Sequence, residues 1–68
     1  MKYSFEMIGN NAGIIWKTLA DKPKQSIVEL EKETKLKRDE ILLALGWLIK
    51  EDKLTYEKIG RGIKFYLK

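Results

Sequence analysis

Two periods of apolar residues divide the chain into predicted strands and helices. At the start, Tyr3, Phe5 and Met7 alternate with polar residues, a period of two that is typical of a strand or an extended arm with one apolar face. Gly9-Asn10-Asn11 breaks this pattern, and an asparagine there can cap a helix. We therefore expect an N-terminal arm or strand over residues 1–9, too short to be stable alone.

A first helix is predicted from residue 11 to residue 21. Its end is set by Pro23, whose ring cannot donate a backbone hydrogen bond and restricts the residue before it. Apolar residues recur at spacings of three and four and form one stripe along this helix, which we expect to lie in the core: Ala12, Ile15, Trp16 and Leu19.

A second helix is predicted over residues 27–33 by the sequence Ser26-Ile27-Val28-Glu29. This is a capping box, in which the Ser26 hydroxyl accepts a hydrogen bond from the third helical N–H and the Glu29 carboxylate accepts one from the Ser26 N–H. Residues 34–37 have no apolar repeat and are predicted to form the turn to a third helix.

The third helix is predicted over residues 38–50, with two acids in its first turn, where they interact favourably with the helix dipole. Leu43 and Trp47 fall on one side of a helical wheel, next to Gly46. The other apolar residues fall in a separate sector, the expected core face: Ile41, Leu42, Ala44, Leu45, Leu48 and Ile49. This helix is therefore apolar on two sides.

The C-terminal part is predicted to be an antiparallel β-hairpin over residues 54–67. Apolar and polar residues alternate on both sides of Gly60-Arg61-Gly62, whose glycines allow the positive φ angles of a tight turn. Three helices followed by a hairpin is the element order of a winged helix-turn-helix domain, an α+β fold in which the hairpin is the wing. We expect one such domain over residues 1–68.

Two segments resemble a known family. Ala44-Leu45-Gly46-Trp47-Leu48, and the spacing from Ala12-Gly13 to Trp16, are similar to those of small stand-alone bacterial and archaeal winged helix-turn-helix domains of uncharacterised function. The resemblance covers about Ile8 to Leu67. It implies the fold and a nucleic-acid-binding ancestry, and it brings no catalytic residues, because none are assigned in the family.

Composition points to a small domain that has no disulfide or metal to stabilise it. The chain has 68 residues, 44% apolar and 35% charged, and neither cysteine nor histidine, so we expect no disulfide, no zinc site and no cofactor. The longest apolar run, residues 41–49, is about half the roughly 18 residues that a membrane span needs. Since no hydrophobic leader opens the chain, we expect a cytoplasmic protein with no membrane partner.

The net charge of +4 is unevenly distributed, because residues 1–25 carry +2, residues 26–57 carry −2 and residues 58–68 carry +4. Basic residues in the turn and in the wing can bind phosphates on two sides of a DNA groove without contacting the nucleobases. This predicts weak, sequence-tolerant binding to double-stranded DNA, related to transcription regulation, through Lys35, Lys37, Arg38, Lys58, Arg61 and Lys64. The alternative is a hairpin whose basic residues only keep it soluble.

The outward positions of the third helix argue against base reading by that helix, since its acids repel phosphates and few of its side chains can bond to base edges. Its apolar patch is covered either by the N-terminal arm of the same subunit or by a partner, such as a second copy in a homodimer. A domain-swapped dimer, in which each arm covers the other subunit, would combine the two. The candidate interface residues are Tyr3, Phe5, Leu43, Gly46 and Trp47. The alternative function is thus a protein-interaction or homodimerisation module that has lost base readout.

We expect neither enzymatic activity nor a small-molecule substrate. Acid–base catalysis needs tuned groups paired in a pocket, whereas the acids of this chain have simpler roles in capping helices, solvating a helix face or bordering turns. The serines have no histidine to activate them.

Overall fold

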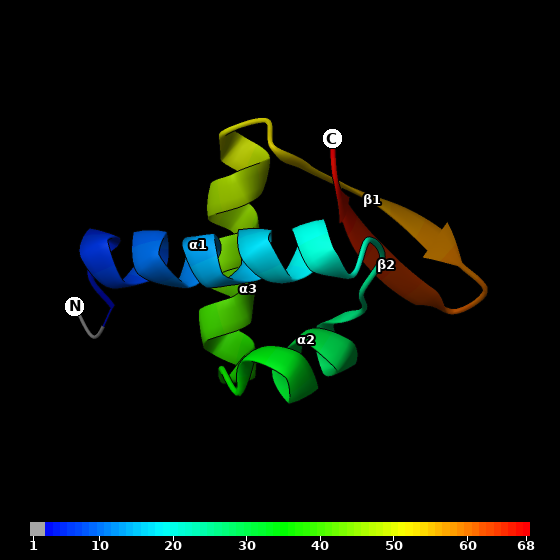
Figure 1. The fold of residues 1–68 in the computed structure, drawn as a ribbon, viewed down its shortest axis with the longest axis horizontal. Helices are drawn as coiled ribbons and strands as arrows, with labels where there is room; N and C mark the ends of the chain where they lie inside the picture. The colour runs from blue at the N-terminus through cyan, green and yellow to red at the C-terminus, as the bar shows by residue number, and fades with distance from the viewer. Residues whose placement is uncertain (1–2) are drawn as a thin grey trace.

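The computed structural model describes residues 3–68 and contains three helices followed by an antiparallel hairpin (Figure 1). The elements are α1 (Phe5–Asp21), α2 (Ile27–Thr34), α3 (Arg38–Lys50), β1 (Leu54–Ile59) and β2 (Gly62–Leu67). This is the winged helix-turn-helix architecture that the order of elements predicted. In Figure 1, α1 crosses α3, α2 lies below α1 beside the lower end of α3, and the hairpin projects to one side as the wing. No helix within residues 3–68 is both long enough and apolar enough to cross a membrane.

The predicted N-terminal strand or arm is wrong, because α1 already begins at Phe5. The Ser4 hydroxyl caps this helix by accepting a hydrogen bond from the Met7 N–H at 3.0 Å. Ile8 is buried and extends the apolar stripe of the helix by one turn toward the N-terminus. This burial, together with the cap at Ser4, outweighs the local period of two. Residues 1–2 of the predicted arm lie outside the described residues.

The buried stripe of α1 is also rotated relative to the prediction. It consists of Ile8, Asn11, Ala12, Ile15 and Leu19. Trp16 stands at the edge of this stripe with 44% of its surface exposed, so the prediction that it is a core residue is wrong.

The core face of α3 is narrower than predicted. Leu42 and Ile49, which the wheel placed in the core, are 50% and 45% exposed, whereas Trp47 is half-buried and packs against the core. The cause is the position of α1, which packs mainly against α3 and lies on the side of Trp47. The residues of α3 that are buried are Ile41, Ala44, Leu45 and Leu48.

The core also fixes the base of the wing. Leu54 of β1 and Phe65 of β2 are buried in the same cluster as Leu30 of α2. The segment between α1 and α2 joins the outer edge of β2, since Gln25 and Phe65 exchange two backbone hydrogen bonds of 3.1 and 2.8 Å. The wing is therefore attached to the helices at its base, while its turn remains exposed.

Candidate nucleic-acid interface

The turn between α2 and α3 holds the first group of candidate bases. Lys35 ends α2 in the left-handed conformation, with φ of 63°, and thereby redirects the chain. The Lys37 N–H donates to Glu40 Oε1 at 2.9 Å, which fixes the start of α3. Lys35, Lys37 and Arg38 are all exposed at this turn.

The wing holds the second group. Gly60, with φ of 61°, makes the turn between the strands possible, and Arg61 follows it at the exposed end of the hairpin. Lys58 is exposed in β1 and pairs in register with Ile63, while Lys64 lies on β2 opposite Glu57. The structure thus places the candidate basic residues in two separate regions of the fold, the turn between α2 and α3 and the wing.

Ion pairs occupy two of these six bases. Arg38 Nη2 lies 3.2 Å from Glu31 Oε1, and Lys64 Nζ lies 3.0 Å from Glu29 Oε1. The other four form no ion pair with any described residue, namely Lys35, Lys37, Lys58 and Arg61. These four are the bases whose charge is available to a phosphate.

Glu29 links the predicted capping box to the wing. The Ser26 N–H donates to Glu29 Oε1 at 2.8 Å, and the Glu29 N–H donates to Ser26 Oγ at 3.2 Å, which confirms the capping box. The hydrogen bond from the Ser26 backbone, followed by that from Lys64, lowers the pKa of Glu29 to about 2. The carboxylate therefore keeps its charge, and Lys64 stays paired, throughout the neutral and mildly acidic range.

The outer face of α3, as we call its exposed side, is mostly apolar. It consists of Asp39, Leu42, Leu43, Gly46, Ile49 and Lys50. Leu42 and Ile49 are functional candidates that sequence reasoning missed, because the wheel assigned them to the core. Apart from the adjacent residues and backbone of α3 itself, a Cβ atom at Gly46 would meet no atom within 4 Å, so packing inside the subunit does not require glycine there.

The N-terminal residues touch α3 within the same subunit. The ring centroids of Phe5 and Trp47 are 6.4 Å apart, and the Tyr3 hydroxyl donates a hydrogen bond to the Asp39 carboxylate. Phe5 is nevertheless 74% exposed, and Leu43 is also exposed. The N-terminal residues of the same subunit therefore contact Trp47 and Asp39, but they leave much of the outer face of α3 exposed.

Within the part of the chain that the structure describes, no cluster of acidic side chains is arranged to hold a metal ion.

Comparison with known proteins agrees with this architecture. A family described as "Winged helix-turn-helix domain (DUF2582)" matches residues 1–67. The solution NMR structure of protein BT2368 from Bacteroides thetaiotaomicron is 34% identical, covers 91% of this chain and 76% of its own, and superposes with a TM-score of 0.84.

A second solved structure shares the fold at lower identity. It is described as giving structural insights into the DNA recognition and protein interaction domains of HOP2, is 24% identical, covers 85% of this chain and 98% of its own, and has a TM-score of 0.70. None of the curated proteins compared with the chain matches it. From its match over residues 1–67, the chain belongs to the DUF2582 family of winged helix-turn-helix domains, a family of uncharacterised function.

Proposed function

We propose that this domain binds double-stranded DNA weakly and without sequence preference, in a role related to transcription regulation. The proposal rests on two groups of exposed basic residues that form no ion pair with a described residue. They are Lys35 and Lys37 in the turn, and Lys58 and Arg61 in the wing. Such bases contact phosphates, and an arginine at the end of a wing suits a narrow minor groove, whose negative potential attracts it.

The same geometry argues against sequence reading. A helix in the major groove recognises bases through side chains such as Arg, Asn and Gln. The outer face of α3 offers mainly leucine, isoleucine and glycine there, together with Lys50 and with Asp39, whose charge repels phosphates. The fold is shared with the HOP2 domains, whose description includes DNA recognition, but at 24% identity this likeness supports the fold alone.

Titration with a random-sequence duplex tests the proposal. Binding should be detectable by NMR or gel shift at low salt and should weaken strongly between about 50 and 200 mM salt, because counterions are released. Arg61→Ala and Lys58→Ala should each weaken binding equally for all DNA sequences. Each should also reduce the slope of log K against log[salt] by about one, since one phosphate contact is lost. Lys17→Ala, which removes an exposed base of α1, is the matched control and should have no effect. Absence of binding at low salt would refute the proposal.

A second candidate function is homodimerisation through the outer face of α3, favoured by its apolar residues and by Gly46. Leu42 and Ile49 lie on the same flank, four residues before and three residues after Gly46. A second copy packed antiparallel would place Leu42 of one subunit opposite Ile49 of the other, with the two glycines at the crossing, where they permit close approach. Asp39 would then face the C-terminal end of the other α3, whose last turn contains Lys50.

Sedimentation over a range of concentrations tests this second function. The expected result is a dimer that Leu42→Glu and Ile49→Glu convert to a monomer. Val28→Glu is the matched control, because Val28 is an equally exposed apolar residue on α2 and should leave the dimer intact. A chain that stays monomeric up to about 1 mM would rule out a specific dimer of useful strength.

A further inference from the structure

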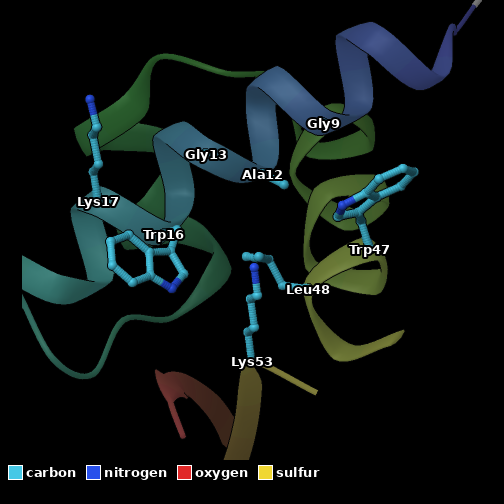
Figure 2. Close-up of a pocket in the computed structure, with 8 residues that line it drawn as sticks. All are labelled: Gly9, Ala12, Gly13, Trp16, Lys17, Trp47, Leu48 and Lys53. Carbon is cyan, nitrogen blue, oxygen red and sulfur yellow. The ribbon is translucent and has the colours of Figure 1, made fainter. Parts of the chain in front are cut away.

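A groove of about 400 Å³ lies between α1 and the C-terminal half of α3 (Figure 2). Small residues of α1 form its floor, with Gly9 and Gly13 one helical turn apart, while Trp16 and Trp47 stand at its sides. This volume is within the range of small-molecule sites, about 300–1,000 Å³. None of the six candidate nucleic-acid-binding residues lines the groove.

The polar side-chain groups of this groove are all hydrogen-bond donors. They are the ammonium groups of Lys17 and Lys53 and the indole N–H groups of Trp16 and Trp47. No acidic residue lines the groove. In Figure 2 the Lys53 side chain points into the space between the two indoles, whereas the Lys17 side chain points away. Lys53 makes no ion pair, and neither indole N–H finds an acceptor, among the described residues. The groove therefore favours an anion and disfavours a cation.

Nothing within the subunit explains the two glycines of the floor. In the interior of a helix, glycine is about 1 kcal/mol less favourable than alanine. Neither Gly9 nor Gly13 has a positive φ, and a Cβ atom at either position would meet no atom within 4 Å apart from the adjacent residues and backbone of α1 itself. Their effect is to leave the helix backbone uncovered by side chains in the groove that Trp16 and Trp47 also line, so that a planar group can approach it closely.

We propose that this groove binds a small organic anion that has a planar apolar body and a carboxylate. The planar body would lie on the glycine floor between Trp16 and Trp47, and the carboxylate would accept hydrogen bonds from the Lys53 ammonium and an indole N–H. The site goes beyond the proposed DNA binding and is independent of it, because it uses none of the bases of the turn or the wing.

The two tryptophans allow a direct test by NMR. The probe is indole-3-acetate, titrated against the ¹⁵N-labelled chain while the two indole N–H signals are followed. Indole-3-ethanol has the same ring without the charge, and acetate has the charge without the ring. We expect indole-3-acetate to shift both indole signals saturably, with a Kd of about 1 mM or tighter, and either control compound to bind at least about tenfold more weakly.

Variants separate the site from general effects on folding. Lys53→Met should weaken binding at least about tenfold, whereas Lys17→Met, whose side chain points away, should change it less than about twofold. Gly13→Ala should raise the melting temperature and yet weaken binding, because the new methyl group occupies the floor. If Gly13 had only a structural role, the substitution would not raise the melting temperature and weaken binding at the same time.

Three results would overturn the proposal. They are the absence of saturable indole shifts up to about 10 mM indole-3-acetate, equal binding of acetate or indole-3-ethanol, and unchanged affinity in both Lys53→Met and Gly13→Ala.

Discussion

Lys64 of the wing and Glu29 of α2, separated by 35 positions in the chain, form an ion pair of 3.0 Å. The same Glu29 oxygen accepts the Ser26 N–H that completes the capping box. One carboxylate therefore both begins a helix and holds the wing against it. Because this pair occupies Lys64, the charge available at the wing belongs mainly to Lys58 and Arg61.

The lowered pKa of Glu29 predicts a pH-dependent stability. A carboxyl group with a lowered folded-state pKa contributes stability that is present above its ordinary value of 4.5 and is lost as the pH falls toward about 2. In Glu29→Gln this contribution is absent, so the melting temperature should fall less between pH 4.5 and pH 2 than in the unaltered chain. Thermal unfolding across this range measures the difference, and equal slopes would contradict the prediction.

The two causes of that pKa shift can be separated. In Lys64→Met the Ser26 N–H still donates to Glu29, so the pKa of Glu29 should rise but stay below 4.5. NMR titration of the Glu29 carboxyl carbon measures it. A pKa that returns to 4.5 would mean that Lys64, and not the helix cap, dominates.

Two serine caps test where the helices begin. Ser26→Ala and Ser4→Ala each remove a hydroxyl that accepts a helical N–H, and each should lower the free energy of unfolding by about 1 kcal/mol. Loss of the Ser4 cap should also increase amide exchange in the first turn of α1. If Asn11→Ala lowered the free energy of unfolding by this amount and Ser4→Ala did not, α1 would begin near residue 11, where the sequence pattern placed it.

Two neighbouring residues of α3 test the position of the core. Ile41 is fully buried, so Ile41→Ala should cost about 2–5 kcal/mol of unfolding free energy, whereas Leu42→Ala should change it by less than about 0.5 kcal/mol at concentrations where the chain is monomeric. Denaturant unfolding measures both. A large loss of unfolding free energy in Leu42→Ala would show that Leu42 belongs to the core, as the helical wheel predicted.

Gly46 provides a stabilising change. Its Cβ would enter open space, so Gly46→Ala should raise the free energy of unfolding by about 0.5–1 kcal/mol, a shift of several degrees in melting temperature for a domain of this size. Thermal unfolding at low concentration avoids any contribution from a dimer. Under the second proposed function the same change should weaken self-association, because the added methyl groups meet at the helix crossing.

The sequence by itself determined the winged helix-turn-helix fold. The capping box at Ser26, the helix over residues 38–50 and the glycine turn between two alternating segments depend on hydrogen bonds and backbone angles within a few residues. The family match covers the chain and the structure has the predicted order of elements. These signals succeed because each depends on contacts close in the sequence. The alternation of Tyr3, Phe5 and Met7 failed, because the Ser4 cap and the burial of Ile8 against other elements favour a helix there.

Only the tertiary structure decided which apolar side chains are buried and which basic groups are free. Burial depends on where another element packs. The position of α1 shifts the core face of α3 away from Leu42 and Ile49, and it leaves Trp16 beside a groove. Likewise, the pairing of Lys64 depends on the docking of the wing against α2. A helical wheel describes a single helix and contains no information about the direction from which its neighbour arrives.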